Sequence, residues 1–351
     1  MINNISYFLV ILFFISCEPD EIPVDIEGVI NYTQIDLGSD YCIQKYYSIQ
    51  EDLVVGENLT SNWDIAFSNF PDSKSIILNS SKYMRVLPLN NILNTNPSVP
   101  LSLDEMLKFN DWKFDDPNGN LFLTAFMNDD QELNYCQSDN NLIEQYTYGD
   151  YLIDKGYDCE NNHLGMCIVR LHSSNENTYS VQIINNIFQP FINWSFSSII
   201  DIEKKDGNNF TYFSLNNTNI VDVVNFEWDL CFSQYTEFNV PSPGNPSATL
   251  PTYRVVGVLQ NHHVSVAVDS INDFSNINSS NIEDYVFKTD RNSIGYDWKV
   301  YDGPAGIYSI VSPVYIIKTH YKDYYKLLFL DFYNNNGEKG APMFQLEKIT
   351  L

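Results

Sequence analysis

Five histidines are the side chains of this sequence best suited to bind a transition metal, because neutral imidazole is a common metal ligand. His262 and His263 are adjacent, and apolar segments at 254–259 and 264–268 flank them. On a strand, neighbouring side chains point to opposite faces, so only one ring of this pair is expected to face a given cavity. The other histidines are His163, His172 and His320.

The familiar motifs of catalytic sites are absent from the sequence. It has no Gly-x-Ser-x-Gly turn, no phosphate-binding glycine loop and no His-Glu-x-x-His pair. Asp and Glu together number 45, so any two chosen as a glycosidase pair would have almost no specificity. Cys-x-x-Cys and paired-His spacings are missing too, which does not favour a zinc site. We therefore assign no catalytic residue and expect a non-enzymatic protein.

The charge balance limits the possible partners. The 351 residues include 19 Lys and Arg against 45 Asp and Glu, a formal net charge of -26. Such a chain is poorly suited to nucleic acid, whose binding depends on neutralising phosphates. It is equally unsuited to anionic membranes through a basic patch. Hydrophobic residues make up 44%, enough for substantial cores, and the length suits two β domains.

The elements that must position these side chains are predicted to be β-strands. Near the C-terminus, dense aromatic and β-branched segments are separated by short polar turns at 320–323 and 334–340. This pattern predicts three consecutive antiparallel strands, at Tyr315–Thr319, Tyr324–Tyr333 and Ala341–Glu347. Helix is expected to be minor, limited to 101–107 and a turn at Asn281–Tyr285. The fold class is therefore all-β with antiparallel sheets.

The sequence contains an internal repeat. The segment Asn62–Ser68 (NWDIAFS) returns as Glu227–Ser233 (EWDLCFS), and a Tyr/Phe-rich strand precedes each. Two further matches occur in the same order, at similar separations of 164 to 186 residues. They pair Asp111-Trp112-Lys113 with Asp297-Trp298-Lys299, and Tyr151–Asp154 with Tyr315–Lys318. We interpret the chain as two copies of one β module, joined around 190–198, in which Trp63 and Trp228 are equivalent and buried.

The repeated Trp-Asp segment is predicted to be a core strand. Trp, the middle aliphatic residue and Phe alternate with Asp and a small residue, which would bury large rings on one face. The Asp is expected to accept hydrogen bonds from neighbouring backbone N–H groups at the strand end. A catalytic Asp is the alternative.

The N-terminus resembles an export signal. An apolar run from Ile5 to Ile15 is too short to span a bilayer, and it ends at Ser16-Cys17. A small residue before Cys resembles a bacterial lipobox, so residues 1–16 are predicted to be a signal peptide. Residues 17–25 would then form an acidic tether lipidated at Cys17, which anchors the protein to the outer membrane or cell surface. A plain cleaved signal peptide is the alternative.

Export to an oxidising compartment makes disulfides plausible among the remaining five cysteines. Cys159 and Cys167 flank a short loop and form the predicted pair. Cys42 with Cys136 is a second hypothesis, which leaves Cys231 free and buried.

Two sequence features together resemble the HmuY-like family of haem-binding lipoproteins of Bacteroidota. One is the C-terminal order YIIKT, turn, YYKLLFLDFY, NNNGEKG, APMFQLE; the other is the Trp-Asp-x-Ala-Phe segment at Trp63–Phe67. The second copy has Cys231 in place of Ala. The resemblance implies two tandem antiparallel HmuY-like β modules, at 26–190 and 191–351.

The resemblance further implies haem capture at the cell surface and transfer to an outer-membrane receptor, with haem as the cofactor. In that family two His or Met side chains hold the iron, from the region after the Trp-Asp segment. The axial-ligand candidates here are His262, His263, His320 and Met343, with no other metal expected. Each has an alternative: a polar turn for the His pair, an exposed turn for His320 and the core for Met343. Arg254 and Lys318 are candidates to contact the haem propionates. A surface adhesion or interaction lipoprotein that uses the modules as a haem-free scaffold is the rival function, and a carbohydrate hydrolase is third.

Overall fold

The computed structural model describes residues 31–71, 73–89, 111–126, 149–174, 177–185, 187, 196–224, 228–243 and 245–350. Within these ranges the protein is almost entirely β, which confirms the predicted class. Helix there consists of the 3-10 segments Ser80–Lys82, Phe274–Asn276 and Ser279–Asp284, and the last of these confirms the expected turn at Asn281–Tyr285. The expected helix at 101–107, Cys17, Cys136 and the predicted signal and tether all lie outside the described residues. In the described part, no helix is both long and apolar enough to span a bilayer.

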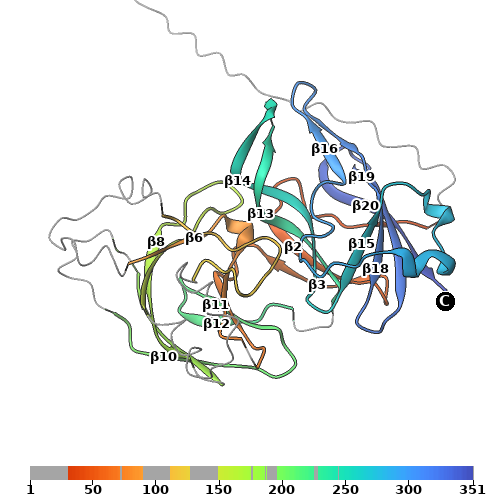
Figure 1. Ribbon diagram of the computed structural model, residues 1–351. Coiled ribbons are helices and arrows are strands. Elements are labelled where there is room, and N and C mark those ends of the chain that lie inside the picture. The colour runs from red at the N-terminus through yellow and green to blue at the C-terminus, as the bar shows by residue number, and fades with distance from the viewer. Residues whose placement is uncertain are drawn as a thin grey trace, which may run out of the picture.

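The strands form two units. In the first unit the strands are β4 (Ile65–Ser68), β5 (Ile76–Leu78), β6 (Arg85–Pro88), β7 (Gly149–Asp154), β8 (Met166–Ser174), β9 (Thr178–Ile184), β10 (Ile200–Glu203), β11 (Phe210–Ser214) and β12 (Asn219–Val221). In the second unit they are β1 (Thr33–Gln34), β2 (Ile43–Ser48), β3 (Leu53–Leu59), β13 (Leu230–Ser242), β14 (Asn245–Gln260), β15 (Ser265–Asp269), β16 (Lys299–Asp302), β17 (Ile307–Ile310), β18 (Val314–Lys318), β19 (Tyr324–Tyr333) and β20 (Lys339–Ile349). Figure 1 shows the first unit on the left and the second on the right.

Each unit has an outer and an inner sheet. The first unit's outer sheet has the order β10-β9-β8-β7-β6 and its inner sheet β12-β11-β4-β5. The second unit's inner sheet is β14-β13-β2-β3 and its outer sheet β1-β20-β19-β18-β15. One apolar core fills each unit between its two sheets, and a third core joins the two inner sheets. The molecule is therefore a stack of four β layers.

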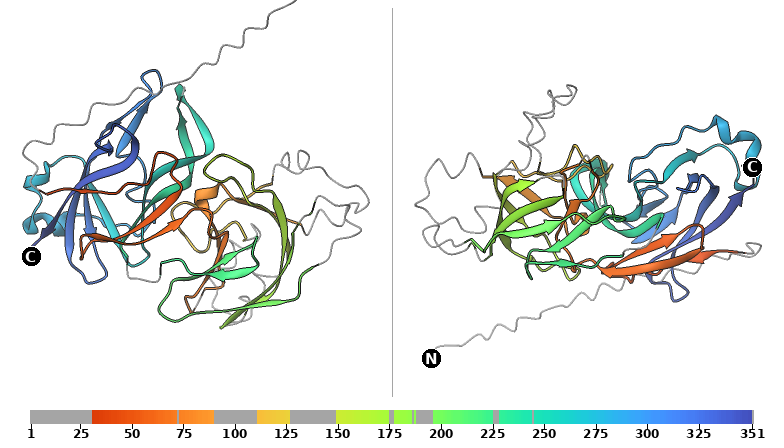
Figure 2. Two further views of the ribbon diagram at one scale, coloured as in Figure 1. Left: turned by 180° about the vertical axis from the view of Figure 1, so that it is seen from behind. Right: turned by 90° about the horizontal axis from the view of Figure 1, so that it is seen from below.

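The N-terminal strands of the chain belong to the unit that contains its C-terminus. Strand β2 pairs with β13 and β1 pairs with β20, so the first strands of the sequence complete the second unit. Figure 2 shows these orange strands beside the blue C-terminal strands. Conversely, β10 and β11 follow the proposed join at 190–198 in the sequence but complete the first unit, because β11 pairs with β4 and β10 pairs with β9. Each Trp-Asp strand is thus paired with a strand that lies far from it in sequence.

The two Trp-Asp segments make the same backbone contacts. Asp64 N–H donates to the Phe213 carbonyl at 2.9 Å, and Asp229 N–H donates to the Tyr47 carbonyl at 2.9 Å. Each Asp carboxylate then accepts a hydrogen bond from a backbone N–H two residues further along that partner segment: Leu215 for Asp64 at 2.6 Å and Ile49 for Asp229 at 2.8 Å. The role predicted for these Asp side chains, at the end of a strand, is confirmed.

The indoles that precede these Asp residues also correspond. Trp63 is 6% and Trp228 8% exposed, and both belong to the core between the inner sheets. The Asn79 side chain donates to the Trp63 carbonyl at 2.9 Å, and that of Asn261 donates to the Trp228 carbonyl at 2.8 Å. The prediction that Trp and Phe share one face was wrong. Because β4 begins only at Ile65, Trp63 lies outside the strand and packs on the opposite side from Phe67.

The proposed match between Trp112 and Trp298 was wrong. In the first unit, Lys113 pairs with Val86 of β6. In the second unit, Val266 of the corresponding strand β15 pairs with Lys288, and not with Lys299. Trp112 lies partly buried against the outer face of the first outer sheet, whereas Trp298 is fully buried in the second unit's core. The shared letters therefore do not mark equivalent positions.

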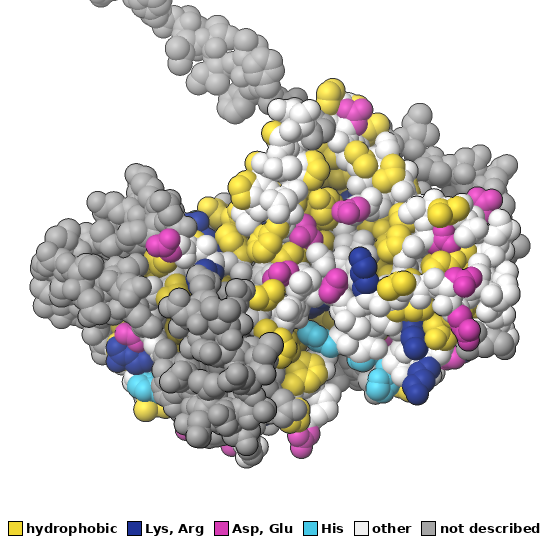
Figure 3. All heavy atoms as spheres, in the orientation of Figure 1, with side chains coloured by type: hydrophobic (Ala, Val, Ile, Leu, Met, Phe, Trp, Pro, Cys, Tyr) yellow, Lys and Arg dark blue, Asp and Glu magenta, His cyan; other side chains and the backbone are white. Residues whose placement is uncertain are grey.

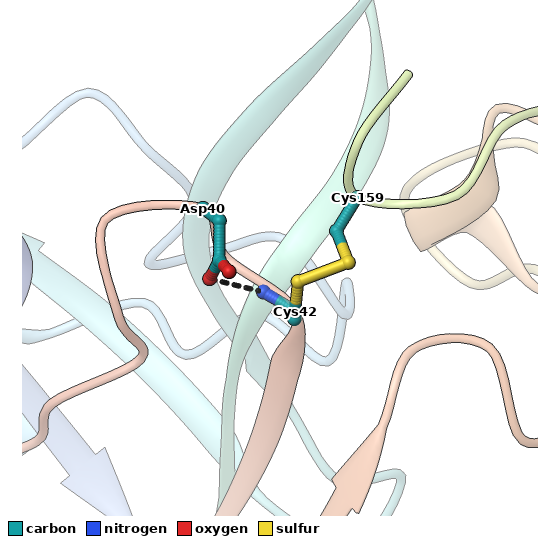
Figure 4. A group of neighbouring side chains, drawn as sticks. All are labelled: Asp40, Cys42 and Cys159. Carbon is teal, nitrogen blue, oxygen red and sulfur yellow. Dashed lines mark hydrogen bonds between the residues drawn. A yellow bond between two sulfur atoms is a disulfide. The ribbon is translucent and has the colours of Figure 1, made fainter. Parts of the chain in front are cut away.

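The predicted disulfide was also wrong. Cys159 is bonded to Cys42 across 117 residues, and not to Cys167 (Figure 4). Cys167 is free because β8 directs it into the first unit's core, where burial raises the pKa of its thiol to about 12. The pairing of Cys42 with Cys136 is excluded by the same bond, whereas Cys231 is free and buried as predicted. Since Cys42 precedes β2 and Cys159 lies in the β7–β8 loop, the disulfide links the two units.

Candidate functional site

A cavity of about 180 Å³ lies where the two inner sheets meet, and three of the five histidines line it. Figure 3 shows histidine atoms beside hydrophobic side chains near the middle of this face. The first unit contributes residues from β11 and the loop before it, and the second unit contributes the β14–β15 and β18–β19 turns. The lining residues are Gly207, Asn208, Asn209, Phe210, Tyr212, Val224, Trp228, Asn261, His262, His263, Arg291 and His320.

The β14–β15 connection places two adjacent histidines on one cavity. Asn261 fixes this connection, because its N–H donates to the Asp229 carbonyl at 2.9 Å and its carbonyl accepts from Val264 N–H at 3.0 Å. Its side-chain oxygen accepts from His262 N–H at 2.7 Å. The prediction that only one of His262 and His263 faces the cavity was wrong, because the pair lies in a turn, where strand alternation does not apply.

His262 is held as a neutral ring among aromatic side chains. Its ring centroid lies 5.5 Å from those of Phe70 and Phe210. Burial, with the positive charge of Arg291 next in size, lowers the pKa of His262 to about 3. The Nε2 atom is buried and has no hydrogen-bond partner in the described structure. An unprotonated imidazole nitrogen without a partner is the form that can coordinate a metal.

His263 and His320 meet at the cavity from two different turns. Their ring centroids are 5.3 Å apart in an edge-to-face arrangement. His263 Nε2 also lies 3.9 Å from a carboxylate oxygen of Asp229, the residue of the Trp-Asp segment. A second hollow of about 80 Å³ adjoins these rings and is lined by Ser48, Gln50, Glu51 and Tyr321 as well. The Trp-Asp strand end therefore places a carboxylate beside one ring of the histidine pair.

The remaining residues singled out from the sequence lie elsewhere. Met343, on β20, is 5% exposed and pairs with Gln34 and Asp331; it is not among the described lining residues. His163 contacts Asp154 at 2.8 Å in the β7–β8 loop, and His172 bonds to Gln182 on the first outer sheet. Neither Arg254, which donates to Asn161, nor Lys318, near the Tyr324 ring, lines the cavity.

The sequence analysis missed two kinds of lining residue. Tyr212 and Trp228 were assigned to strands rather than to a site, and Phe210 was not singled out; the exchange of strands between units is what brings Phe210 and Tyr212 to the histidines. Arg291 was missed because it lies in a polar stretch, Asp290-Arg291-Asn292-Ser293, that looks like an ordinary loop. Its one available signal is that it is a cation among few in a strongly acidic chain.

The fold and the cavity define an all-β protein with a histidine- and aromatic-lined cavity between two β units. Residues 206–346, about two-fifths of the chain, match the sequence model of the family described as HmuY protein. The resemblance to that family is thus confirmed for this C-terminal portion of the chain. No curated protein sequence matches the chain.

Solved structures show similarity at low sequence identity. Apo PinO from Porphyromonas gingivitis is 9% identical, with 91% of this chain and 97% of that chain covered and a TM-score of 0.32. An HmuY-like haem-binding protein from Bacteroides vulgatus is 11% identical, covering 51% and 90%, with a TM-score of 0.23. The apo HmuY analogue of Tannerella forsythia is 11% identical, covering 56% and 88%, with a TM-score of 0.24.

Proposed function

We propose that this protein binds haem, without enzymatic activity, in the cavity between its two units. The observation that carries the proposal is the convergence of His262, His263 and His320 from two turns onto one aromatic-lined cavity. Haem requires one or two axial ligands beside apolar surface. The imidazoles of the cavity would supply the ligands, and its aromatic rings would supply the apolar surface. The match of residues 206–346 to the sequence model of the HmuY family supports the same function.

The chain's own residues would divide the work of binding. His263 and His320 would hold the iron, because their rings come from two different turns and meet at the cavity. The aromatic rings of Phe210, Tyr212 and Trp228 would cover the porphyrin faces. Haem supplies the redox-active iron; the protein supplies position and an apolar environment. A cavity of about 180 Å³ is smaller than the roughly 300–1,000 Å³ that encloses a typical drug-sized ligand, so part of the porphyrin would stay outside.

The N-terminal sequence supports a location for this function. Lipidation at Cys17 would hold the protein at the outer membrane or cell surface, and the partly exposed porphyrin would then be accessible to an outer-membrane receptor. We also propose that the chain carries two HmuY-like modules, at 26–190 and 191–351, whose N-terminal strands have exchanged places. The matching hydrogen bonds of Asp64 and Asp229 support this duplication.

Absorption spectroscopy tests haem binding. Adding hemin to the purified protein should give a sharpened, red-shifted Soret band. Replacing both His263 and His320 by Ala should remove that band, whereas His172→Ala, on the first outer sheet, should leave it unchanged. A spectrum like that of free hemin with the wild-type protein would contradict haem binding and favour the scaffold function instead.

A further inference from the structure

The cavity is positively charged although the protein is strongly acidic. Among the described residues that line it, none is Asp or Glu, while Arg291 contributes a permanent positive charge. The whole chain, in contrast, has a net charge of -26. Long-range repulsion of an anion by the surface must therefore be overcome locally, and a cation at the binding surface is the direct means.

The backbone of Arg291 is fixed between the two units. Its N–H donates to the Asn118 carbonyl of the first unit at 2.7 Å, and its carbonyl accepts from Gln260 N–H of the second unit at 2.8 Å. The side-chain stem packs against Gly119, where an added Cβ would lie 2.8 Å from Arg291 Cβ. The guanidinium is thereby held at the boundary between the units.

The guanidinium is incompletely paired. Its Nε atom is buried and has no hydrogen-bond partner in the described structure. The nearby Asp115 carboxylate already accepts from Leu78 N–H at 2.6 Å and Ala125 N–H at 2.7 Å. A buried, unsatisfied guanidinium nitrogen is costly for the protein alone, and a ligand that accepts its hydrogen bond would remove that cost.

We propose that Arg291 binds a carboxylate of the ligand and makes the cavity selective for tetrapyrroles with free carboxylates, whether or not they contain iron. This inference rests on the proposed haem-binding function. His262 Nε2, another buried nitrogen without a hydrogen-bond partner in the described structure, belongs to the same cavity. Arg291 and His262 also both line a second hollow. The planar fork of Arg matches a carboxylate with two parallel hydrogen bonds, which Lys cannot reproduce.

Iron-free porphyrin tests this inference separately from iron ligation. Protoporphyrin IX and its dimethyl ester differ only in their carboxylates, and quenching of tryptophan fluorescence reports binding of either. We expect the wild-type protein to bind the free acid about tenfold or more tightly than the ester, as a charge-assisted hydrogen bond implies. Arg291→Met should lose this preference by weakening only the free acid, and Arg291→Lys should fall between.

Arg170→Met is the matched control, because Arg170 pairs with Asp150 on the first outer sheet, away from the cavity. It should bind both porphyrins as the wild-type protein does. Equal binding of acid and ester by the wild type, or equal losses in the Arg170 and Arg291 variants, would overturn the inference. The acid–ester comparison needs no variant, so it remains decisive if Arg291→Met does not fold. If hemin gives no Soret shift but the protein still prefers the free acid to the ester, the result would contradict iron ligation and leave the inference about Arg291 standing.

Discussion

The two units share a framework but differ where the second unit places its histidines. Asn79 and Asn261 hold equivalent strand ends, yet the residues that follow are Ser80-Ser81 in the first unit and His262-His263 in the second. By strand register, the position of His320 in the β18–β19 turn corresponds to Gly156 after β7. All three cavity histidines are therefore peculiar to the second unit.

In the first unit, the residues at these positions form buried polar contacts instead. Lys82 follows Ser81 and forms a buried ion pair with Asp64, whose counterpart Asp229 instead lies 3.9 Å from His263. The Ser81 hydroxyl accepts a hydrogen bond from Gln44 of the second unit at 2.8 Å. The comparison shows how one scaffold supports either a closed polar core or an accessible histidine pair, depending on which side chains follow the Asn.

Removing Asp64 should have a large effect on stability and should distinguish the role of Asp64 from that of Asp229. Asp64→Ala leaves the Lys82 ammonium buried without its partner, so we expect a loss of about 3–5 kcal/mol in the free energy of unfolding. Asp229→Ala removes the acceptor of the Ile49 N–H and a carboxylate 3.9 Å from a partly exposed His263, so about 1–2 kcal/mol is expected. Urea denaturation measures both. Adding Lys82→Met to Asp64→Ala should recover much of the loss, and equal losses for the two single variants would contradict the distinction.

The disulfide tests whether the units behave as one body. Replacing Cys42 and Cys159 by Ser removes a link across 117 residues, which the chain-entropy model values at roughly 4–5 kcal/mol. Because the bond joins the units at the opposite end of β2 from His263, we expect lower stability with little change in hemin binding. Thermal denaturation with and without reductant makes the measurement. The double variant should be insensitive to reductant, and an unchanged melting temperature would refute the contribution.

A buried lysine in the second unit should give its stability a distinct pH dependence. Lys299 donates to the Val256 carbonyl at 2.5 Å and lies 4.2 Å from the Trp298 ring centroid. Burial lowers the pKa of Lys299 to about 7, and the charge of Asp297 opposes that shift. Between pH 7 and the ordinary lysine pKa of about 10.5 the unfolded state binds more protons, so this group makes stability rise with pH. Lys299→Met should flatten that rise, by a few kcal/mol at most.

Urea denaturation of the wild-type protein and of Lys299→Met at pH 6, 8 and 9.5 compares their free energies of unfolding. If the wild-type protein and Lys299→Met differ by the same amount at all three values, Lys299 does not titrate in this range.

Sequence patterns predicted the parts of the fold that depend on local alternation. The strands β18, β19 and β20 pair antiparallel as expected, because their aromatic and β-branched residues alternate over enough positions to define a buried face. The exchange of β1–β3 with β10–β12 could not be predicted. Both β2 and β11 present two adjacent aromatic residues to a Trp-Asp strand, Tyr46-Tyr47 and Tyr212-Phe213, so local sequence does not distinguish the two partners.

The site was predicted only in part for related reasons. The histidines could be named from their chemistry, but their convergence depends on the arrangement of turns from distant segments. Proximity in sequence favoured a Cys159–Cys167 disulfide, whereas the apolar run Met166–Val169 places Cys167 in a core strand. Arg291 has no local pattern at all, because its role depends on the meeting of both units.

The smallest expected effect comes from Cys231, which occupies the place of Ala66 in the other unit. Both lie in the core between the inner sheets, and each pairs with a strand from the opposite half of the sequence. Burial raises the pKa of the Cys231 thiol to about 12, so alkylating reagents should not modify it in the folded protein. Cys231→Ala, which copies the first unit, removes one buried sulfur and should cost about 1 kcal/mol or less. Mass spectrometry after iodoacetamide treatment and a thermal melt check both expectations. Rapid modification under native conditions would mean that the inner sheets separate, and the shared layer between the units would then be far less stable than its burial implies.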